Sequence, residues 1–234
     1  MKSGNLTTIG FDADDTLWQN EQFFQFTEKR LTELLADYAG EEHVSHRLLE
    51  AEKRNIGVYG FGIKGFTLSM IETAIEVTEG RITAAGIAEI LAAGREMLAH
   101  PIEILPHAGE ALEALAGTYR LVLVTKGDLF DQERKLAQSG LGELFEAVEI
   151  VSAKTPETYS RVFARHGDGP RKSMMVGNSV KSDIIPAIEA GSWAIHVPHD
   201  LTWVLEQVEP PLDAPRFRQI PDLGQLPEIV REIG

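Results

Sequence analysis

The segment Leu6-Thr-Thr-Ile-Gly-Phe-Asp-Ala-Asp-Asp-Thr-Leu17 decides the fold. A short β-rich run ends at Phe11, and the acidic cluster Asp12-Ala-Asp-Asp15 follows it directly. In an open parallel sheet, ligands bind just outside the carboxyl ends of the strands. The acidic cluster is therefore a candidate site, and the polar residues after each further strand are candidates for the same site.

Further apolar runs predict the other strands, and helical patterns lie between them. The strands are predicted over residues 119–125, 147–151, 173–177, 192–197 and 217–220. Helices are predicted over residues 129–139 and 156–166, with a last helix from about residue 222. Apolar strands that alternate with helices are typical of a parallel sheet covered on both faces. We expect an α/β fold with a doubly wound, Rossmann-like core.

The stretch between the first two strands has no strand pattern. Amphipathic spacing predicts helices around residues 23–38, 68–78 and 87–98, and more weakly over 43–55. We therefore expect residues 1–17 and 106–234 to form the core, and residues 18–105 to form an inserted all-helical domain.

Composition narrows the function. The 234 residues carry a formal net charge of -14, which opposes nucleic-acid binding by general electrostatics. There is no cysteine, so disulfides, thiolate metal sites and cysteine nucleophiles are excluded. No apolar run has the length of a signal peptide or a membrane span. We expect a cytoplasmic enzyme, monomer or homodimer, with a small-molecule substrate and no nucleic-acid or membrane partner.

Paired carboxylates suggest the chemistry. Side chains alternate in extended chain, so Asp12 and Asp14 project to one side while Asp15 points away. One carboxylate can then act as a nucleophile, and the other can hold a proton for a leaving group. Asp12 and Asp183, after the fourth strand, offer the oxygen ligands that Mg²⁺ prefers.

Two further strand ends provide groups suited to phosphoryl oxygens. The hydroxyl of Thr125 can hold one oxygen, and Lys154 can neutralise charge. Taken singly, each of these residues has a structural interpretation: Asp clusters form turns, lone Thr and Lys side chains are solvated, and Ser179 can cap a helix. Their occurrence in order at four predicted strand ends favours a functional site.

In these four segments the chain resembles the haloacid dehalogenase-like superfamily. The segments are 11–17 (an apolar strand, then Asp-x-Asp-x-Thr), 121–125 (a strand ending in Thr), the isolated Lys154, and 175–179 followed by Asp183. The resemblance spans the whole chain, because this family inserts a mobile cap after the first of these segments. It implies a magnesium-dependent phosphatase that hydrolyses a small phosphate monoester through an aspartyl-phosphate intermediate.

The resemblance also implies a role for each residue. Asp12 would be phosphorylated, and Asp14 would serve as general acid and base while its backbone carbonyl contacts the metal. Thr125 and Lys154 would hold the phosphoryl group, and Asp183 would ligate or orient Mg²⁺. The family usually has an acid where this chain has Asn178. An amide oxygen can still ligate the metal, with one negative charge fewer.

Lys64 lies in Gly60-Phe-Gly-Ile-Lys-Gly65, which fits a dinucleotide-binding pattern. Because no strand precedes this segment, we interpret it as a loop between cap helices, from which Lys64 is a candidate substrate ligand. Paired histidines elsewhere lack zinc-ligand spacing.

Three other functions stay open. Phosphomutases share all four segments. Haloacid dehalogenases use the same nucleophile, but they generally lack Asp at the position of Asp14. A receiver-like module, phosphorylated to switch a partner, has the phosphorylated Asp on a middle strand and no large insert.

Overall fold

A computed structural model describes residues 6–234, and they form two compact units. One unit comprises the described residues up to Glu21 together with Ile102–Lys126 and Gln132–Gly234; the other comprises Gln22–Pro101 and Gly127–Asp131. The first contains the strands, and the second consists mainly of helices. The expected boundaries lay at residues 17–18 and 105–106, whereas the units divide after Glu21 and after Pro101, and Gly127–Asp131 groups with the helical unit.

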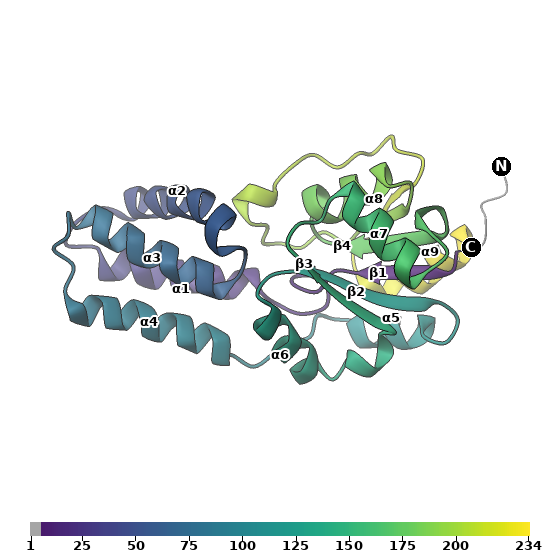
Figure 1. The fold of residues 1–234 in the computed structure, drawn as a ribbon, viewed down its shortest axis with the longest axis horizontal. Coiled ribbons are helices and arrows are strands. Elements are labelled where there is room, and N and C mark those ends of the chain that lie inside the picture. Colours follow the sequence, from purple (N-terminus) through teal and green to yellow (C-terminus); the bar gives the residue numbers. More distant parts are fainter. Residues whose placement is uncertain (1–5) are drawn as a thin grey trace. The chain divides into compact units, whose positions relative to one another are not determined.

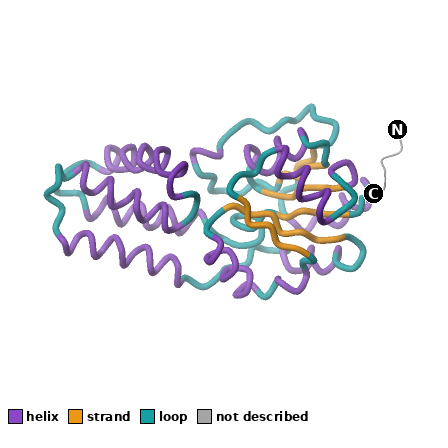
Figure 2. The backbone as a smooth tube through the Cα atoms, viewed as in Figure 1, coloured by secondary structure: helices purple, strands orange, loops and turns teal. Residues whose placement is uncertain are grey.

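The sheet of the first unit, whose strands are orange in Figure 2, is parallel throughout. Its strand order is β3-β2-β1-β4-β5-β6. The strands are β1 (Thr8–Phe11), β2 (Arg120–Lys126), β3 (Ala147–Val151), β4 (Ser173–Gly177), β5 (Trp193–His196) and β6 (Phe217–Gln219). Phe11 pairs with Leu123 on β2 and with Val176 on β4. The strand order therefore reverses between β1 and β4, and ligands bind at this kind of switch point in open α/β sheets.

Helices cover both faces of the sheet (Figure 1). They are α5 (Ala108–Leu115), α6 (Leu129–Ser139), α7 (Pro156–His166), α8 (Ile185–Glu189) and α9 (Leu226–Ile233). Alternate residues of each strand face opposite ways, so Leu121 and Leu123 pack with α5 and α9 while Val122 and Val124 pack with α7 and α8. This two-sided burial is why the strands are apolar without interruption.

The second unit has a hydrophobic core of its own. It is built from α1 (Glu21–Leu34), α2 (Glu41–Tyr59), α3 (Ile63–Val77) and α4 (Ala84–Ala99). Leu35, Leu48 and Met70 are among its fully buried side chains. The amphipathic spacing seen in the sequence reflects this core, since each helix buries one stripe of apolar residues.

The two chain segments that lead to and from the helical unit are paired within the first unit. Gln19 N–H donates to the carbonyl of Glu103, and Leu105 N–H donates to the carbonyl of Leu17, both at 2.9 Å. The carboxylate of Asp15 accepts hydrogen bonds from the backbone N–H groups of Asn20 and Glu21, at 2.8 and 3.0 Å. The connection is therefore fixed up to Glu21.

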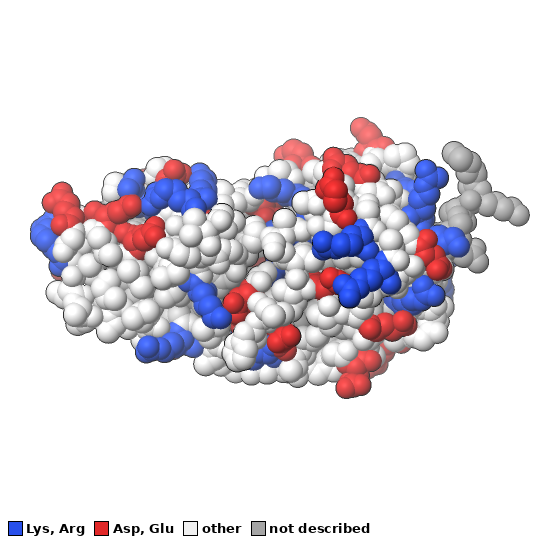
Figure 3. All heavy atoms as spheres, in the orientation of Figure 1, with Lys and Arg blue, Asp and Glu red and all other residues white. Residues whose placement is uncertain are grey.

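Charges are mixed on the surface. On the face that Figure 3 shows, Lys and Arg side chains lie among Asp and Glu side chains, and one small group of adjoining basic side chains is bordered by acidic ones. None of the helices within residues 6–234 combines the length and apolar character that crossing a bilayer requires.

Candidate active site

Three of the predicted site residues meet at the carboxyl ends of β1, β3 and β4. Lys154 donates a hydrogen bond to Asp12 Oδ1 and another, 2.6 Å long, to Asp183 Oδ1. All three side chains are buried. Asp12 directly follows β1, and Asp183 lies in a turn beyond β4, so the cluster occupies the switch point of the sheet.

This cluster carries excess negative charge. Two carboxylates share the single ammonium of Lys154, so one negative charge is uncompensated whenever both carboxylates are ionised. Burial, with the charge of Asp183, raises the pKa of Asp12 to about 7, although Lys154 acts in the opposite direction. The two carboxylates raise the pKa of Lys154 against the effect of its burial, so it stays an ammonium.

Asp183 is held rigidly by its surroundings. Its Oδ2 accepts from the backbone N–H of Ser179 at 3.0 Å, and the Tyr159 hydroxyl lies 3.4 Å from its Oδ1. Burial and the neighbouring carboxylates raise the pKa of Tyr159 well above its usual value, so the phenol keeps its proton. Gly177 leaves the room for this arrangement, because a Cβ there would lie 2.3 Å from Asp183 Oδ2.

Asp14 is separated from this cluster by partners of its own. Its carboxylate accepts from Trp18 Nε1 and Gln132 Nε2, both at 2.8 Å, and from Lys135 Nζ at 3.0 Å. Burial acts to raise the pKa of Asp14, but Lys135 and these hydrogen bonds outweigh it and lower the pKa. Asp14 is therefore ionised in this arrangement. Asp15 turns away, as the strand alternation predicted, and accepts backbone N–H groups.

Thr125 ends the buried part of β2, two residues beyond the partner of Phe11. Its hydroxyl donates to the carbonyl of Lys126 at 3.2 Å. Lys126, the next residue of β2, is only partly exposed, and its ammonium donates to Ser182 and to Glu206.

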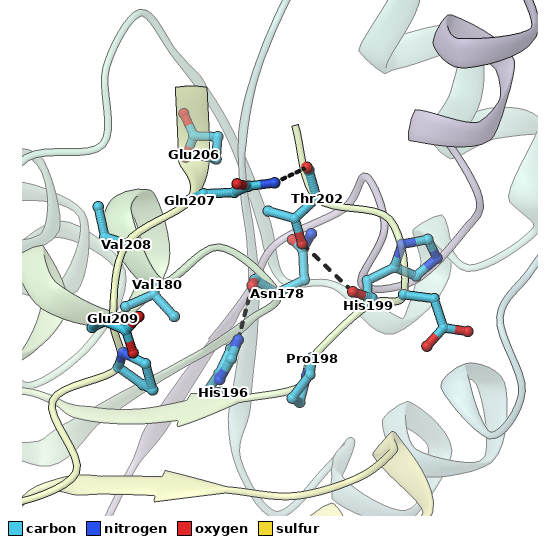
Figure 4. A pocket seen from close by; sticks show the side chains of 12 residues that line it. Asn178, Val180, His196, Pro198, His199, Thr202, Glu206, Gln207, Val208 and Glu209 are labelled. Carbon is cyan, nitrogen blue, oxygen red and sulfur yellow. Dashed lines mark hydrogen bonds between the residues drawn. The ribbon is translucent and has the colours of Figure 1, made fainter. Parts of the chain in front are cut away.

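Asn178 follows β4 and is linked to Thr16. Its backbone N–H donates to Thr16 Oγ1 at 3.0 Å, and that hydroxyl donates to Asn178 Oδ1 at 3.3 Å. His196 Nε2 donates to the Asn178 carbonyl at 3.0 Å (Figure 4). Ser179, which we considered as a helix cap, does cap the turn after β4, since its side chain accepts from Ser182 N–H.

Asn178 also lines an open pocket of about 580 Å³, whose lining comes mostly from the chain after β5 (Figure 4). Figure 4 shows Asn178 between His196 and Thr202. The lining includes the acids Asp200, Glu206 and Glu209, and neither Lys nor Arg occurs among the described residues that form it. Such a wall does not suit a phosphoryl group, so the Lys154 cluster is the better candidate for that group.

Lys64, which we expected in a loop, lies in the first turn of α3, and it has an acidic partner within the helical unit. Its ammonium lies 2.9 Å from Asp128 Oδ1, and both residues belong to that unit. The ring of Phe130 lies 5.9 Å from the same ammonium. The side chain of Lys64 is 56% exposed, so its role as a substrate ligand stays a prediction. To bind a substrate, Lys64 would have to break its ion pair with Asp128.

The oxygen donors fit Mg²⁺. Asp12 and Asp183 supply carboxylates, Asn178 an amide oxygen and Asp14 a backbone carbonyl, which is the hard-oxygen set that this ion prefers. The uncompensated negative charge beside Lys154 also favours a cation. Within residues 6–234, no three His, Cys, Asp or Glu side chains are grouped as a metal site. The donor set therefore includes the amide of Asn178 and a backbone carbonyl.

Sequence reasoning missed several residues of this site. Gln132 and Lys135 hold Asp14, Tyr159 contacts Asp183, and Glu206 contacts the turn after β4. The first two lie three residues apart on α6, which places them on one helical face. This three-residue spacing is the only feature of the sequence that could have pointed to Gln132 and Lys135. Solvent-exposed polar pairs on helices have the same spacing, so it does not identify a site.

Comparisons with known proteins identify the family of this chain. The family model described as haloacid dehalogenase-like hydrolase matches residues 6–191. This chain belongs to that family, and it is therefore a hydrolase by class.

Three proteins of known name or structure are similar to this chain. A haloacid dehalogenase-like family hydrolase from Xanthomonas campestris is 42% identical, with a TM-score of 0.87 over 97% of this chain and 91% of that one. Glyceraldehyde 3-phosphate phosphatase from Methanothermobacter thermautotrophicus is 27% identical over 96% of this chain and all of its own length. Pyrimidine 5'-nucleotidase YjjG from Escherichia coli is 23% identical over 78% of this chain and 82% of that protein.

Proposed function

We propose that this protein is a magnesium-dependent phosphatase that hydrolyses a small phosphate monoester through a phosphorylated Asp12. The observation that carries the proposal is the buried Lys154, which binds both Asp12 and Asp183 at the switch point of the sheet. Two named relatives, a sugar-phosphate phosphatase and a nucleotidase, support a phosphate monoester as the substrate class.

In the first half of the reaction, a carboxylate oxygen of Asp12 attacks the phosphorus atom and the bond to the ester oxygen breaks. The departing oxygen takes a proton from the Asp14 carboxyl. Lys154 and Thr125 hold the phosphoryl oxygens, where negative charge gathers in the transition state. Bound Mg²⁺ would supply further charge neutralisation between the nucleophile and the phosphoryl group; Asp12, Asp183, Asn178 and the Asp14 carbonyl would hold it.

In the second half, water attacks the phosphorus atom and the bond to Asp12 breaks. Asp14 accepts the proton from water, and inorganic phosphate leaves. The ionised Asp14 seen beside Lys135 and Gln132 suits this step. To serve the first half it has to bind a proton, so we infer that the contact with Lys135 loosens between the two steps.

The alternatives from the same family are distinguished by Asp14 and by the product. A dehalogenase does not protonate an ester oxygen and needs no acid at the position of Asp14. Here three side chains donate hydrogen bonds to the Asp14 carboxylate, which favours phosphate esters as substrates. A phosphomutase passes the phosphoryl group back to a sugar hydroxyl instead of releasing it as phosphate.

The test is a screen for phosphate release from a panel of phosphate monoesters, with Mg²⁺ or with EDTA. We expect release from at least one ester, loss of activity with EDTA and recovery with Mg²⁺. The matched variant is Asp12→Asn, which keeps the shape but not the nucleophile, and it should fall to background with an unchanged circular dichroism spectrum. Turnover by Asp12→Asn at the normal rate would refute the covalent mechanism, and full activity in EDTA would refute the metal.

A further inference from the structure

Glu206 lies outside the predicted site residues, on the segment after β5, and its carboxylate contacts the turn that carries Asp183. Glu206 Oε2 accepts hydrogen bonds from the hydroxyls of Ser179 and Ser182, each 2.5 Å long. Its Oε1 accepts from Lys126 Nζ at 2.9 Å. One carboxylate thus connects the ends of β2 and β4.

The chemistry of these groups allows one arrangement of donors. A carboxylate only accepts, so both serine hydroxyl protons point to Glu206. The Ser182 oxygen then accepts from Lys126 at 2.8 Å, and the Ser179 oxygen accepts from Ser182 N–H at 3.0 Å. Burial acts to raise the pKa of Glu206, but Lys126 and the serines outweigh it and lower the pKa, which keeps the carboxylate ionised.

The turn held in this way is unusual. Val180–Ile184 forms a single turn of π-helix, a geometry that is rare and often found at functional sites. Asp183 lies within it and is completely buried, so its carboxylate has no freedom to adjust if the turn shifts. Glu206 and Lys126 expose only 14% and 16% of their side chains, so their ion pair is well shielded from water.

We propose that Glu206 is a positioning residue that sets the affinity of the site for Mg²⁺. It acts through Ser179 and Ser182, which fix the turn that presents Asp183, and it touches neither the metal nor the reacting atoms. Lys126 neutralises Glu206, so the carboxylate orients the turn without adding net charge next to the cluster. This inference rests on the proposed function, because the metal site is part of that function.

The test is calorimetric titration of the full chain with magnesium chloride. Supporting groups around metal ligands typically change affinity by roughly 10- to 100-fold when they are removed, and we expect Glu206→Ala to raise the Kd for Mg²⁺ by this factor. Glu206→Gln should have a smaller effect, because its amide oxygen still accepts from the serines while its NH₂ group cannot accept from Lys126. Ser182→Ala should weaken binding as well.

Glu209→Gln is the matched control. Glu209 is exposed on the same segment, so the substitution removes the same charge without touching the turn. Screening of exposed charges should keep its Kd within roughly twofold of that of the unmodified protein. Equal weakening by Glu209→Gln and Glu206→Gln would overturn the proposal, because general electrostatics would then explain both.

Steady-state kinetics at saturating Mg²⁺ distinguish a residue that positions the metal ligand from one that only stabilises the fold. At saturating Mg²⁺, the Glu206 variants should recover most of kcat and keep the KM for the ester, with only the magnesium requirement displaced. Magnesium curves that superimpose for Glu206→Ala and the unmodified protein would overturn the inference alone. An unmodified protein that binds no Mg²⁺ would overturn the metal site and this inference together. If Glu206→Ala fails to fold, Glu206→Gln and Ser182→Ala carry the same comparison.

Discussion

Asn178 shows how one residue changes a metal site without changing its other parts. Its amide oxygen accepts from Thr16, and its backbone N–H binds the same hydroxyl. A carboxylate at this position could keep the bond from Thr16 and add one negative charge near Asp12 and Asp183. That charge would attract a cation, and it would also repel the two carboxylates when the cation is absent.

We therefore predict that Asn178→Asp tightens Mg²⁺ binding. The concentration needed for half-maximal activity should fall on the order of tenfold, equivalent to about 1.4 kcal/mol. Asn178→Ala, which removes the oxygen, should raise it. A magnesium titration of the three proteins at fixed substrate checks the order. If all three curves coincide, Asn178 serves only in the link to Thr16.

At the residue scale, sequence reasoning works where chemistry and position coincide. Asp12, Lys154 and Asp183 follow predicted strands, and the structure brings them into one hydrogen-bonded cluster. Lys135 and Glu206 could not be identified in this way. The first binds a carboxylate 121 residues away, and the second binds a serine 24 residues away, through contacts that exist only in the folded chain.

At the scale of elements, apolar runs located the strands well because the sheet is buried on both faces. The predicted strand 173–177 is β4, and the predicted helix 156–166 is α7, whose N-cap Thr155 and first-turn proline mark its start. Helix α5 and the π-helical turn were not predicted. Helix α5 is short, and the turn depends on bonds to Glu206 and Asp183, so local pattern carries little signal for either.

The junction of β4 with this turn leads to a prediction about Gly177. A Cβ at this position would lie 2.3 Å from Asp183 Oδ2 and 2.4 Å from its Cγ, so Gly177→Ala has to displace the buried carboxylate. Overpacking of this kind costs about 1–3 kcal/mol, and we expect that loss in the free energy of unfolding together with weakened Mg²⁺ binding. Urea unfolding and a magnesium titration measure the two effects.

Gly57→Ala is the control for this prediction. Gly57 lies inside α2, and an added Cβ there would meet nothing within 4 Å. Alanine is the better helix former, so this variant should gain about 0.5–1 kcal/mol. A Gly177→Ala protein as stable as the original, with unchanged magnesium affinity, would show that the turn adapts at little cost.

At the scale of the whole molecule, the chain divides into two units that each have a core, and we propose that the helical unit acts as a mobile cap. Such lids exclude water and complete a site when substrate binds. The connecting segments limit where the chain can bend. Leu17–Gln19 pairs with Glu103–Leu105, and Asp15 holds the backbone N–H groups up to Glu21. We therefore expect the hinges at Glu21–Gln22 and Pro101–Ile102.

Cap motion can be measured directly because the chain has no cysteine of its own. Arg165 lies on α7 and Glu79 follows α3, and their side chains are 69% and 82% exposed. Cysteines introduced at these two positions would carry a pair of dyes, one on each unit. We predict that Mg²⁺ with vanadate, a phosphate analogue, shifts and narrows the distribution of energy transfer, because closing binds the analogue from both sides. A control pair at Val58 and Glu79, both in the helical unit, should not respond. If energy transfer in the first pair is as unchanged as in the control pair, the helical unit does not move when the analogue binds. Its loops would then have to contribute to substrate choice without closing.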